Sequence, residues 1–319
     1  MPSEVSVIIP THNRRAMVRE AIASVMTQRG ASFELIVVDD GSTDGTAEEL
    51  DRLAAAMKAE SADRACMYVV RKENHGVAAA RNAGVAIASA PMIAFLDSDD
   101  LWLPHKLERH LASMRAHPEY AIGQTEEIWM RGGRRVNPGL RHRKRAGDIF
   151  IDSLRTCLIS SSAVILRTAL FREVGGFDER MAAAEDYDLW LRILANHEVG
   201  FLAEPLVMRR AGHPAQLSAT VPAIDRFRIL ALLKLIAGDD LDPSQRRAGC
   251  DVLAEKCAIY AQGLRRRGRE IDATMVAEIS ARANTAGDEP RRASLHDAIA
   301  PMLALIAHEG SRAVTEAAA

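Results

Sequence analysis

The sequence predicts an α/β protein with a mainly parallel central sheet, flanked by helices, and an α-helical C-terminal extension. Over the first 115 residues, four short apolar runs rich in β-branched residues each precede a helical pattern. Such alternation produces parallel strands joined by right-handed crossovers. After residue 222 only helical patterns occur. We therefore expect an α/β half at 1–115, a second half of the same domain at 116–221, and a helical extension at 222–319.

The first half contains four rounds of strand and helix. Helical spacing of Val18, Ile22 and Val25 gives the first helix an apolar face. The pattern Thr46-x-x-Glu49 predicts a capping box at the start of the second helix. The expected strands and helices are 5–9 and 14–26, 33–38 and 46–59, 67–70 and a small-residue helix around 81, and 92–96 and 104–114.

Past residue 115 this alternation breaks. Leu189, Trp190 and Ile193 recur at helical spacing and predict a helix over 184–194. The other expected elements are one or two strands at 121–130, a basic loop at 131–145, strands at 160–166 and 199–202, a polar loop at 209–214, and helices at 224–237, 243–267 and on to about 307.

Composition excludes several classes of protein. The net charge of −2 argues against a general nucleic-acid binder. The four cysteines form no CxxC pair and no zinc-binding spacing, so free thiols in a reducing compartment are expected. The N-terminus lacks a signal-peptide pattern, and the later apolar stretches are too short to span a bilayer. We expect a cytoplasmic protein without a transmembrane segment, with peripheral contact at the inner membrane face left open.

The fourth strand ends in a cluster of carboxylates. Asp97, Asp99 and Asp100 follow the apolar run 93–96, with Ser98 between the first two. Mg²⁺ is typically held by one or two carboxylates together with substrate phosphates, so Asp97 and Asp99 suit a hard divalent cation. A solvated turn before the next helix explains the same residues. The cluster alone does not decide between the two interpretations.

Polar residues also follow other strands. Thr11, His12 and Asn13 come after the first strand, and Asp39 and Asp40 come after the second. The carboxyl ends of parallel strands meet at one edge of a sheet, where α/β proteins bind ligands. This convergence favours a binding site. Neither a P-loop nor a GxGxxG motif is present, so phosphate handling is expected from a metal and side chains.

Three later features each have a functional and a structural interpretation. Glu185 and Asp186 lie in the first turn of a predicted helix, where an acid can act chemically or stabilise the helix dipole. His213 could bind a metal or a phosphate, or lie on the surface. The basic loop at 131–145 could be a solvated loop, or it could bind an anionic acceptor or an acidic membrane face.

Taken together, five segments of this sequence resemble the family 2 glycosyltransferases, which have the GT-A fold. The segments are 5–13, 37–46, 74–84, 95–100 and 185–186. The similarity covers about residues 3 to 215 and leaves out the helical C-terminal third. It implies that 1–115 binds a nucleotide sugar and that 116–221 binds the acceptor and completes the catalytic site.

The resemblance also implies roles for single residues. Asp99 would be the main ligand of Mg²⁺ or Mn²⁺, and Asp186 would be the general base. Asp40 would accept a hydrogen bond from the nucleobase, and Arg81 would lie near the diphosphate. The remaining nucleotide-sugar-binding residues would be Pro10, Thr11, His12, Asn13, Asp97 and Ser98. His12 stands where members often have a stacking tyrosine.

We therefore expect an inverting glycosyltransferase that moves a sugar from a UDP-, GDP- or dTDP-linked donor to an acceptor hydroxyl, in glycan, polysaccharide or glycolipid biosynthesis. The acceptor would be a carbohydrate, a lipid-linked or another hydroxyl compound, with an anionic acceptor left open. Dimerisation through the C-terminal helices is open as well. The alternatives are a degenerate nucleotide-sugar-binding or scaffold protein, and a sugar nucleotidyltransferase, which is expected to show a glycine-rich loop after the first strand.

Overall fold

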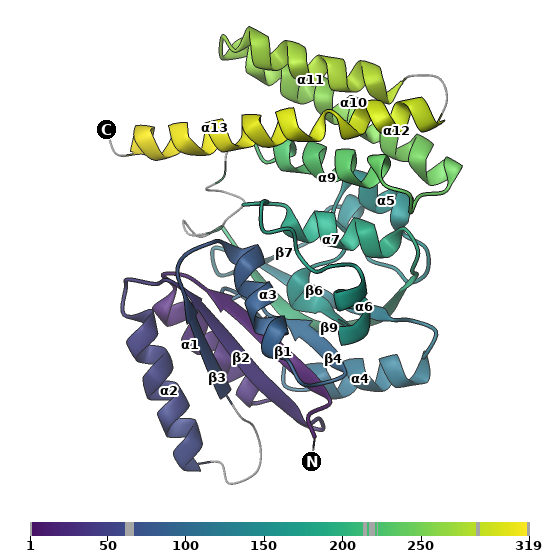
Figure 1. Ribbon diagram of the computed structural model, residues 1–319. Helices are drawn as coiled ribbons and strands as arrows, with labels where there is room; N and C mark the ends of the chain where they lie inside the picture. Colours follow the sequence, from purple (N-terminus) through teal and green to yellow (C-terminus); the bar gives the residue numbers. More distant parts are fainter. Residues whose placement is uncertain are drawn as a thin grey trace.

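The computed structural model describes residues 2–60, 67–212, 216, 221, 223–284 and 288–317. In this part of the chain nine strands form one sheet in the order β3-β2-β1-β4-β8-β6-β9-β5, with β7 paired to β6. Helices flank the sheet, and a further group of helices lies at one end of it (Figure 1). The strands are β1 (Val5–Thr11), β2 (Phe33–Asp40), β3 (Met67–Lys72), β4 (Met92–Phe95), β5 (Leu101–Trp102), β6 (Ile122–Arg131), β7 (Arg134–Val136), β8 (Val164–Arg167) and β9 (Val199–Ala211).

The first four strands are parallel, as predicted. β1 pairs with β2 and β4, and β2 pairs with β3, all in parallel register. Every residue of β1 and β2 is buried, which is typical of strands covered on both faces. β8 lies antiparallel between β4 and β6, so the complete sheet is mixed. Because β1, β2 and β4 run parallel, their carboxyl ends lie at the same edge of the sheet.

Short helices connect and cover these strands. They are α1 (Arg15–Met26), α2 (Thr46–Glu60), α3 (Val77–Ile87), α4 (Lys106–Ala116), α5 (Phe150–Arg155), α6 (Thr168–Glu173) and α7 (Glu185–Leu194). Helix α3 packs closely against β1 at Gly84. A Cβ atom added at this position would lie only 2.6 Å from Ile8 Cγ2. The expected capping box at the start of α2 is wrong in detail. The Asp44 carboxylate accepts the Thr46 backbone N–H at 3.1 Å, and Glu49 instead pairs with Arg52.

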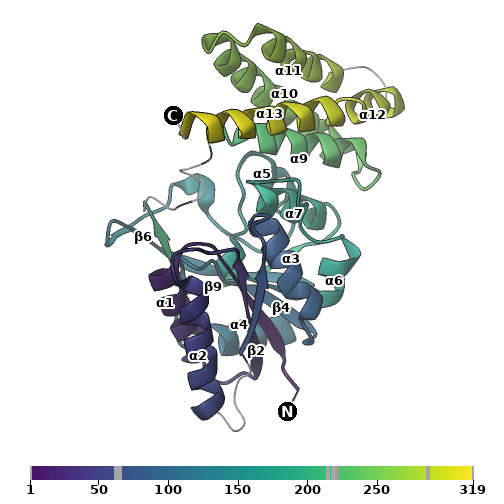
Figure 2. The same ribbon diagram turned by 60° about the vertical axis from the view of Figure 1, so that its left-hand side comes forward.

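The C-terminal helices continue the core of the α/β part. They are α9 (Asp225–Ala237), α10 (Pro243–Arg266), α11 (Glu270–Ala283), α12 (Asp288–His296) and α13 (Ile299–Ala317). Two views place them together beyond α5 and α7 (Figures 1 and 2). One apolar cluster runs from Phe95 of β4 through Trp190 of α7 to Leu232 of α9. Among the described helices, none combines the length and apolar composition needed to cross a bilayer.

Several elements differ from the expectations. The strand expected at 199–202 extends to Ala211, because β9 pairs along the whole length of β6 across a register shift near Glu126. Arg209 and Arg210 therefore lie in a strand instead of a loop. The strand expected at 160–166 begins only at Val164, after a 3-10 turn over Ser161–Ala163. The short strand β5 and the helices α5 and α6 were not expected, and β7 lies within the stretch expected to be a basic loop.

Candidate active site

A cleft of about 640 Å³ opens at the carboxyl ends of β1, β2 and β4. Most of the polar residues expected at these strand ends line it. Asp39 is the exception, and its carboxylate instead accepts the Ser42 backbone N–H at 3.1 Å. Helices α7 and α9 also contribute residues to the lining. Acids that are distant in the sequence, such as Asp99 and Asp186, therefore line the same cleft. Among the residues that line the cleft are Pro10, Thr11, His12, Asn13, Arg14, Asp40, Arg81, Asp97, Ser98, Asp99, Asp100, Trp129, Cys157, Glu185, Asp186, Arg209 and Arg228.

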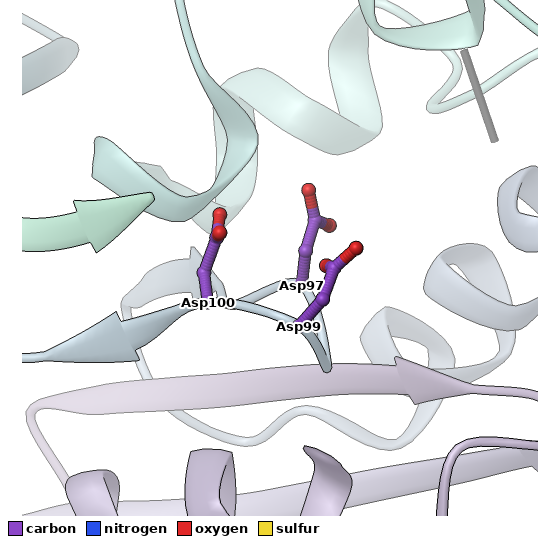
Figure 3. Close-up of side chains that lie close together, drawn as sticks. All are labelled: Asp97, Asp99 and Asp100. Atoms are coloured by element: carbon purple, nitrogen blue, oxygen red, sulfur yellow. The ribbon is translucent and has the colours of Figure 1, made fainter. Parts of the chain in front are cut away.

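The carboxylate cluster after β4 lines this cleft. Asp97, Asp99 and Asp100 each offer an oxygen within 4.8 Å of the others, and their side chains rise toward the same side of the loop (Figure 3). Asp100 is buried and serves the fold. Its carboxylate accepts hydrogen bonds from Ser162 Oγ at 2.6 Å and the Arg210 backbone N–H at 2.9 Å. Burial, with the charges of Asp97 and Asp99, raises the pKa of Asp100 well above its ordinary value.

Asp97 and Asp99 are the carboxylates suited to a divalent cation. About a third of the Asp97 side chain is exposed, and its backbone N–H donates to Ser162 Oγ at 3.1 Å. Asp99 Oδ2 lies 3.0 Å from Arg14 Nη1, which also donates to Ser98 Oγ at 3.3 Å. Carboxylate oxygens are the hard ligands that Mg²⁺ and Mn²⁺ prefer. The residues present therefore fit such an ion. Arg14 was not predicted, although it directly follows the motif after the first strand.

The loops after β1 and β2 are tied together. Asn13 has a φ of 51°, its backbone N–H donates to Ser42 Oγ at 2.8 Å, and its side-chain oxygen accepts the Thr43 N–H at 2.7 Å. His12 Nδ1 lies 2.9 Å from the carbonyl oxygen of Asp40. The imidazole is thus held in a defined orientation at the exposed rim of the cleft, and the backbone of Pro10 and Thr11 leads into it.

The carboxylate of Asp40 organises the loop after β3. It lies 2.6 Å from Lys72 Nζ and accepts the backbone N–H groups of His75 at 3.0 Å and Gly76 at 2.8 Å. An ionised carboxylate can accept about four hydrogen bonds. Acceptor capacity therefore remains at this wall of the cleft, and the expected hydrogen bond from a base to Asp40 stays a prediction.

Arg81 forms a buried bridge between two acids. Its Nη2 donates to Asp97 Oδ1 at 2.7 Å and its Nη1 donates to Glu185 Oε1 at 2.6 Å. Burial disfavours the charge of this guanidinium, but Asp97 and Glu185 raise the pKa of Arg81 above its ordinary value. Burial raises the pKa of Glu185 to about 7, against the opposing effect of Arg81. This bridge was not predicted.

Helix α7 presents its first acids as expected. It begins after Ala184, which has a left-handed φ of 56°. Asp186 lines the cleft, and its Oδ1 accepts the Tyr187 backbone N–H at 2.7 Å. Cys157 Sγ lies 4.0 Å from the other carboxylate oxygen. Burial and the charge of Asp186 raise the pKa of the Cys157 thiol well above its ordinary value, so this group stays protonated beside the acid.

A wall formed by β6 and β9 also lines the cleft, with the cation Arg209 supplied by β9 and Trp129 by β6. The Arg209 guanidinium lies over the Trp129 ring, 4.8 Å from its centroid. Burial opposes its charge, but Glu127 and Asp100 are the main groups that raise the pKa of Arg209 above its ordinary value. The basic loop is mostly exposed, as its solvated interpretation predicted, except that Lys144 is buried 3.3 Å from Glu127. His213, the other expected metal ligand, lies outside the described residues.

Comparison with known sequences identifies the family of this chain. Residues 6–174 match the family model of Glycosyl transferase family 2, and residues 147–210 match that of Glycosyltransferase like family 2. The chain belongs to glycosyltransferase family 2. An uncharacterized glycosyltransferase of Rickettsia conorii is 34% identical over 210 residues, which is 64% of this family 2 chain and 32% of the relative. The match thus spans about a third of that relative's length.

Other proteins similar to this chain have more specific names. The Escherichia coli UDP-Glc:alpha-D-GlcNAc-diphosphoundecaprenol beta-1,3-glucosyltransferase is 31% identical over 198 residues, covering 61% of this chain and 71% of the relative. The Staphylococcus aureus protein TarS, residues 1–349 in complex with UDP-GlcNAc, has a TM-score of 0.67 at 21% identity over 94% of this chain and 88% of that one. A Pyrobaculum calidifontis mannosyltransferase in complex with GDP-Man and Mn²⁺ has a TM-score of 0.62 at 18% identity over 95% and 81%. The predicted GT-A fold is confirmed.

Proposed function

We propose that this chain is a metal-dependent, inverting glycosyltransferase that moves a sugar from a nucleotide-diphosphate donor to an acceptor hydroxyl. One observation supports this most directly: the polar ends of β1 and β2, the pair Asp97 and Asp99, and the helix-borne Asp186 all line the same cleft. Displacement at a sugar carbon needs a leaving-group site on one side and a base on the other. This cleft offers suitable groups for both.

The donor half would be formed by the loops after β1, β2 and β4. His12, held by the Asp40 carbonyl, offers a ring on which a nucleobase can stack. Ser98 and Asp97 would face the ribose, and the bridge of Arg81 would support the diphosphate side. Relatives of this fold bind UDP-GlcNAc or GDP-Man, which supports a nucleotide sugar without choosing the base.

Asp97 and Asp99 would hold Mg²⁺ or Mn²⁺ beside the diphosphate. When bound, such an ion neutralises the negative charge that develops on the leaving group. The chain supplies further positive charge from Arg14, which is already 3.0 Å from Asp99. Arg209 lines the same cleft and adds a second guanidinium near these acids.

Asp186 would take the proton from the acceptor hydroxyl as its oxygen attacks the anomeric carbon. The bond from that carbon to the diphosphate oxygen breaks in the same step, so the configuration at the carbon inverts. No covalent sugar intermediate is required. Asp186 suits this role because one carboxylate oxygen is oriented by the Tyr187 N–H while the side chain reaches the cleft.

The acceptor would bind on the side of α7, α9 and the β6–β9 wall. One relative is named for an acceptor that carries a diphosphate and a polyprenyl chain. A lipid-linked or other anionic acceptor is therefore our proposal for the class, with Arg209 and Arg228 as cations on that side of the cleft. A lipid-linked acceptor would place the protein at a membrane face during the reaction.

The test is thermal stability with UDP-, GDP- and dTDP-linked sugars, each with Mn²⁺, Mg²⁺ or EDTA. A ligand that binds only the folded protein at a hundredfold excess over its Kd stabilises it by about 2.7 kcal/mol. We expect one nucleotide class to stabilise the protein, and EDTA to remove most of the effect. A folded protein that responds to none of these ligands would instead favour the scaffold alternative.

A further inference from the structure

The Arg81 bridge connects the two halves of the cleft. Its guanidinium belongs to α3, its first partner Asp97 follows β4, and its second partner Glu185 begins α7. Glu185 lies directly before Asp186. The donor side and the acceptor side are therefore joined through one buried side chain, by two hydrogen bonds of 2.7 and 2.6 Å.

The backbone before Glu185 is strained. Ala184 has a φ of 56°, a left-handed conformation that is sterically unfavourable for a residue other than glycine. Such strain persists only where surrounding contacts determine the conformation. The bond from Arg81 to Glu185 is a contact of this kind, because it fixes the residue that immediately follows the strained one.

Stability alone does not explain a buried ion pair at this position. Desolvation makes such pairs weak contributors, and well-packed apolar replacements are often as stable or more stable. Here the cost is visible, since burial raises the pKa of Glu185 to about 7 although Arg81 opposes it. A precise direction for the neighbouring Asp186 is a benefit that an apolar pair would not supply.

We propose that Arg81 and Glu185 are positioning residues that orient the Asp186 carboxylate relative to Asp97 and Asp99. Neither is required to exchange a proton with the substrate. Glu185 accepts a hydrogen bond from Arg81, which holds the first turn of α7 in place. Arg81 also donates to Asp97, so the position of this turn is defined relative to the carboxylate cluster. The inference rests on the proposed function, because it assigns its purpose to the base named there.

The experiment compares Glu185→Gln, Glu185→Asp and Arg81→Lys with wild type. The control is Glu179→Gln, an exposed acid whose carboxylate accepts only the neighbouring Asn82 amide among the hydrogen bonds of the described residues. Each protein is assayed for nucleotide-dependent stabilisation with Mn²⁺, and for release of nucleoside diphosphate with water as the acceptor. The substrate is whichever of UDP-glucose, UDP-GlcNAc and GDP-mannose stabilises wild type most.

At metal sites, loss of a side chain that orients a ligand typically costs about 10–100-fold in metal affinity or activity, and we take this as the scale for a residue that orients a base. We expect Glu185→Gln to lower kcat by about that factor while the donor KM and the nucleotide-dependent stabilisation stay within about threefold of wild type. Glu185→Asp keeps the charge but withdraws the carboxylate by one methylene, so it should be no better than Gln. Arg81→Lys cannot bridge both acids and should lose kcat similarly, while Glu179→Gln should lose nothing.

Two outcomes would overturn the positioning role. One is full kcat in Glu185→Gln or in Arg81→Lys. The other is restoration of kcat by Glu185→Asp, which would indicate that charge alone matters. If Glu185→Gln does not fold, the absence of nucleotide-dependent stabilisation reveals it, and Arg81→Lys then carries the test. A folded wild-type protein without any turnover would contradict the proposed function and the inference with it, whereas an active wild type beside an active Glu185→Gln contradicts the positioning role alone.

Discussion

Lys234 of α9 and Asp188 of α7 form an ion pair of 2.7 Å in the interior of the protein. The same ammonium lies 2.6 Å from Asp178. Asp188 is two residues beyond the proposed base, so the C-terminal helices are fastened to the helix that carries Asp186. Ile224 and Arg228 of the same region also line the cleft. The helical extension therefore contributes to the wall of the candidate active site.

We predict that Lys234→Met destabilises the protein. Removing the ammonium leaves Asp178 and Asp188 with fewer partners, and a buried polar group that loses its partner costs on the order of 1–3 kcal/mol. Urea unfolding measures the change, with Lys58→Met on the exposed end of α2 as control. Equal unfolding midpoints for the two variants would show that the pair contributes nothing to docking.

Gly84 provides a prediction about packing. In Gly84→Ala the new methyl would meet Ile8 Cγ2 at 2.6 Å, so α3 or β1 must shift. Overpacking of this kind typically costs about 1–3 kcal/mol. A methyl group added at Gly139 would meet no atom within 4 Å, so Gly139→Ala is the matched control. The measurement is the free energy of unfolding, and an unchanged value for Gly84→Ala would contradict the close packing.

Asp99 and Asp100 are adjacent but should behave differently. Asp99→Ala should remove most of the Mn²⁺-dependent stabilisation by nucleotide, because it deletes the proposed main ligand. Asp100→Ala should lower the stability of the ligand-free protein by about 1–3 kcal/mol, since it leaves Ser162 and the Arg210 N–H without their acceptor. Thermal unfolding with and without Mn²⁺ separates the two. Full Mn²⁺ dependence in Asp99→Ala would argue against the metal assignment.

The raised pKa of Glu185 predicts a pH dependence of stability. Burial and Asp186 raise this pKa to about 7, Arg81 opposes them, and the ordinary value is 4.5. Between these values the folded protein holds a proton that the unfolded chain releases, so the stability from this group is complete below about pH 4.5 and is lost as pH rises through about 7. We expect Glu185→Gln to remove this decline. Parallel stability curves for both proteins from pH 5 to 8 would contradict the shift.

Local patterns were sufficient for most of the α/β half. The strand β1 and the helix α1 have strong signals within a dozen residues, and their order determines the parallel pairing of β1 to β4. The long strand β9 was missed beyond residue 202 because its pairing partner β6 lies about 80 residues earlier in the chain. Arg209 and Arg210 looked like loop residues for the same reason.

The site was predictable where residues share a motif. Asp97 and Asp99 follow one strand, and the sequence placed them correctly at the cleft. Arg81 and Glu185 are 104 residues apart, and neither position shows in its local pattern that the two side chains meet. The structural role of Asp100 depends on hydrogen bonds from Ser162 and Arg210, and the local sequence gave no sign of these contacts either. Contacts of this kind arise from tertiary packing, which no local periodicity describes.

The most direct test of the proposed reaction is the turnover of Asp186→Asn. General base catalysis contributes about 10²–10⁴-fold, and kcat for nucleoside diphosphate release should fall by that factor. Metal-dependent stabilisation by nucleotide should remain at the wild-type level, because the donor half is untouched. Asp51→Asn, an exposed acid on α2, serves as control. Turnover in Asp186→Asn within a few-fold of wild type would contradict Asp186 as the base and with it the proposed mechanism.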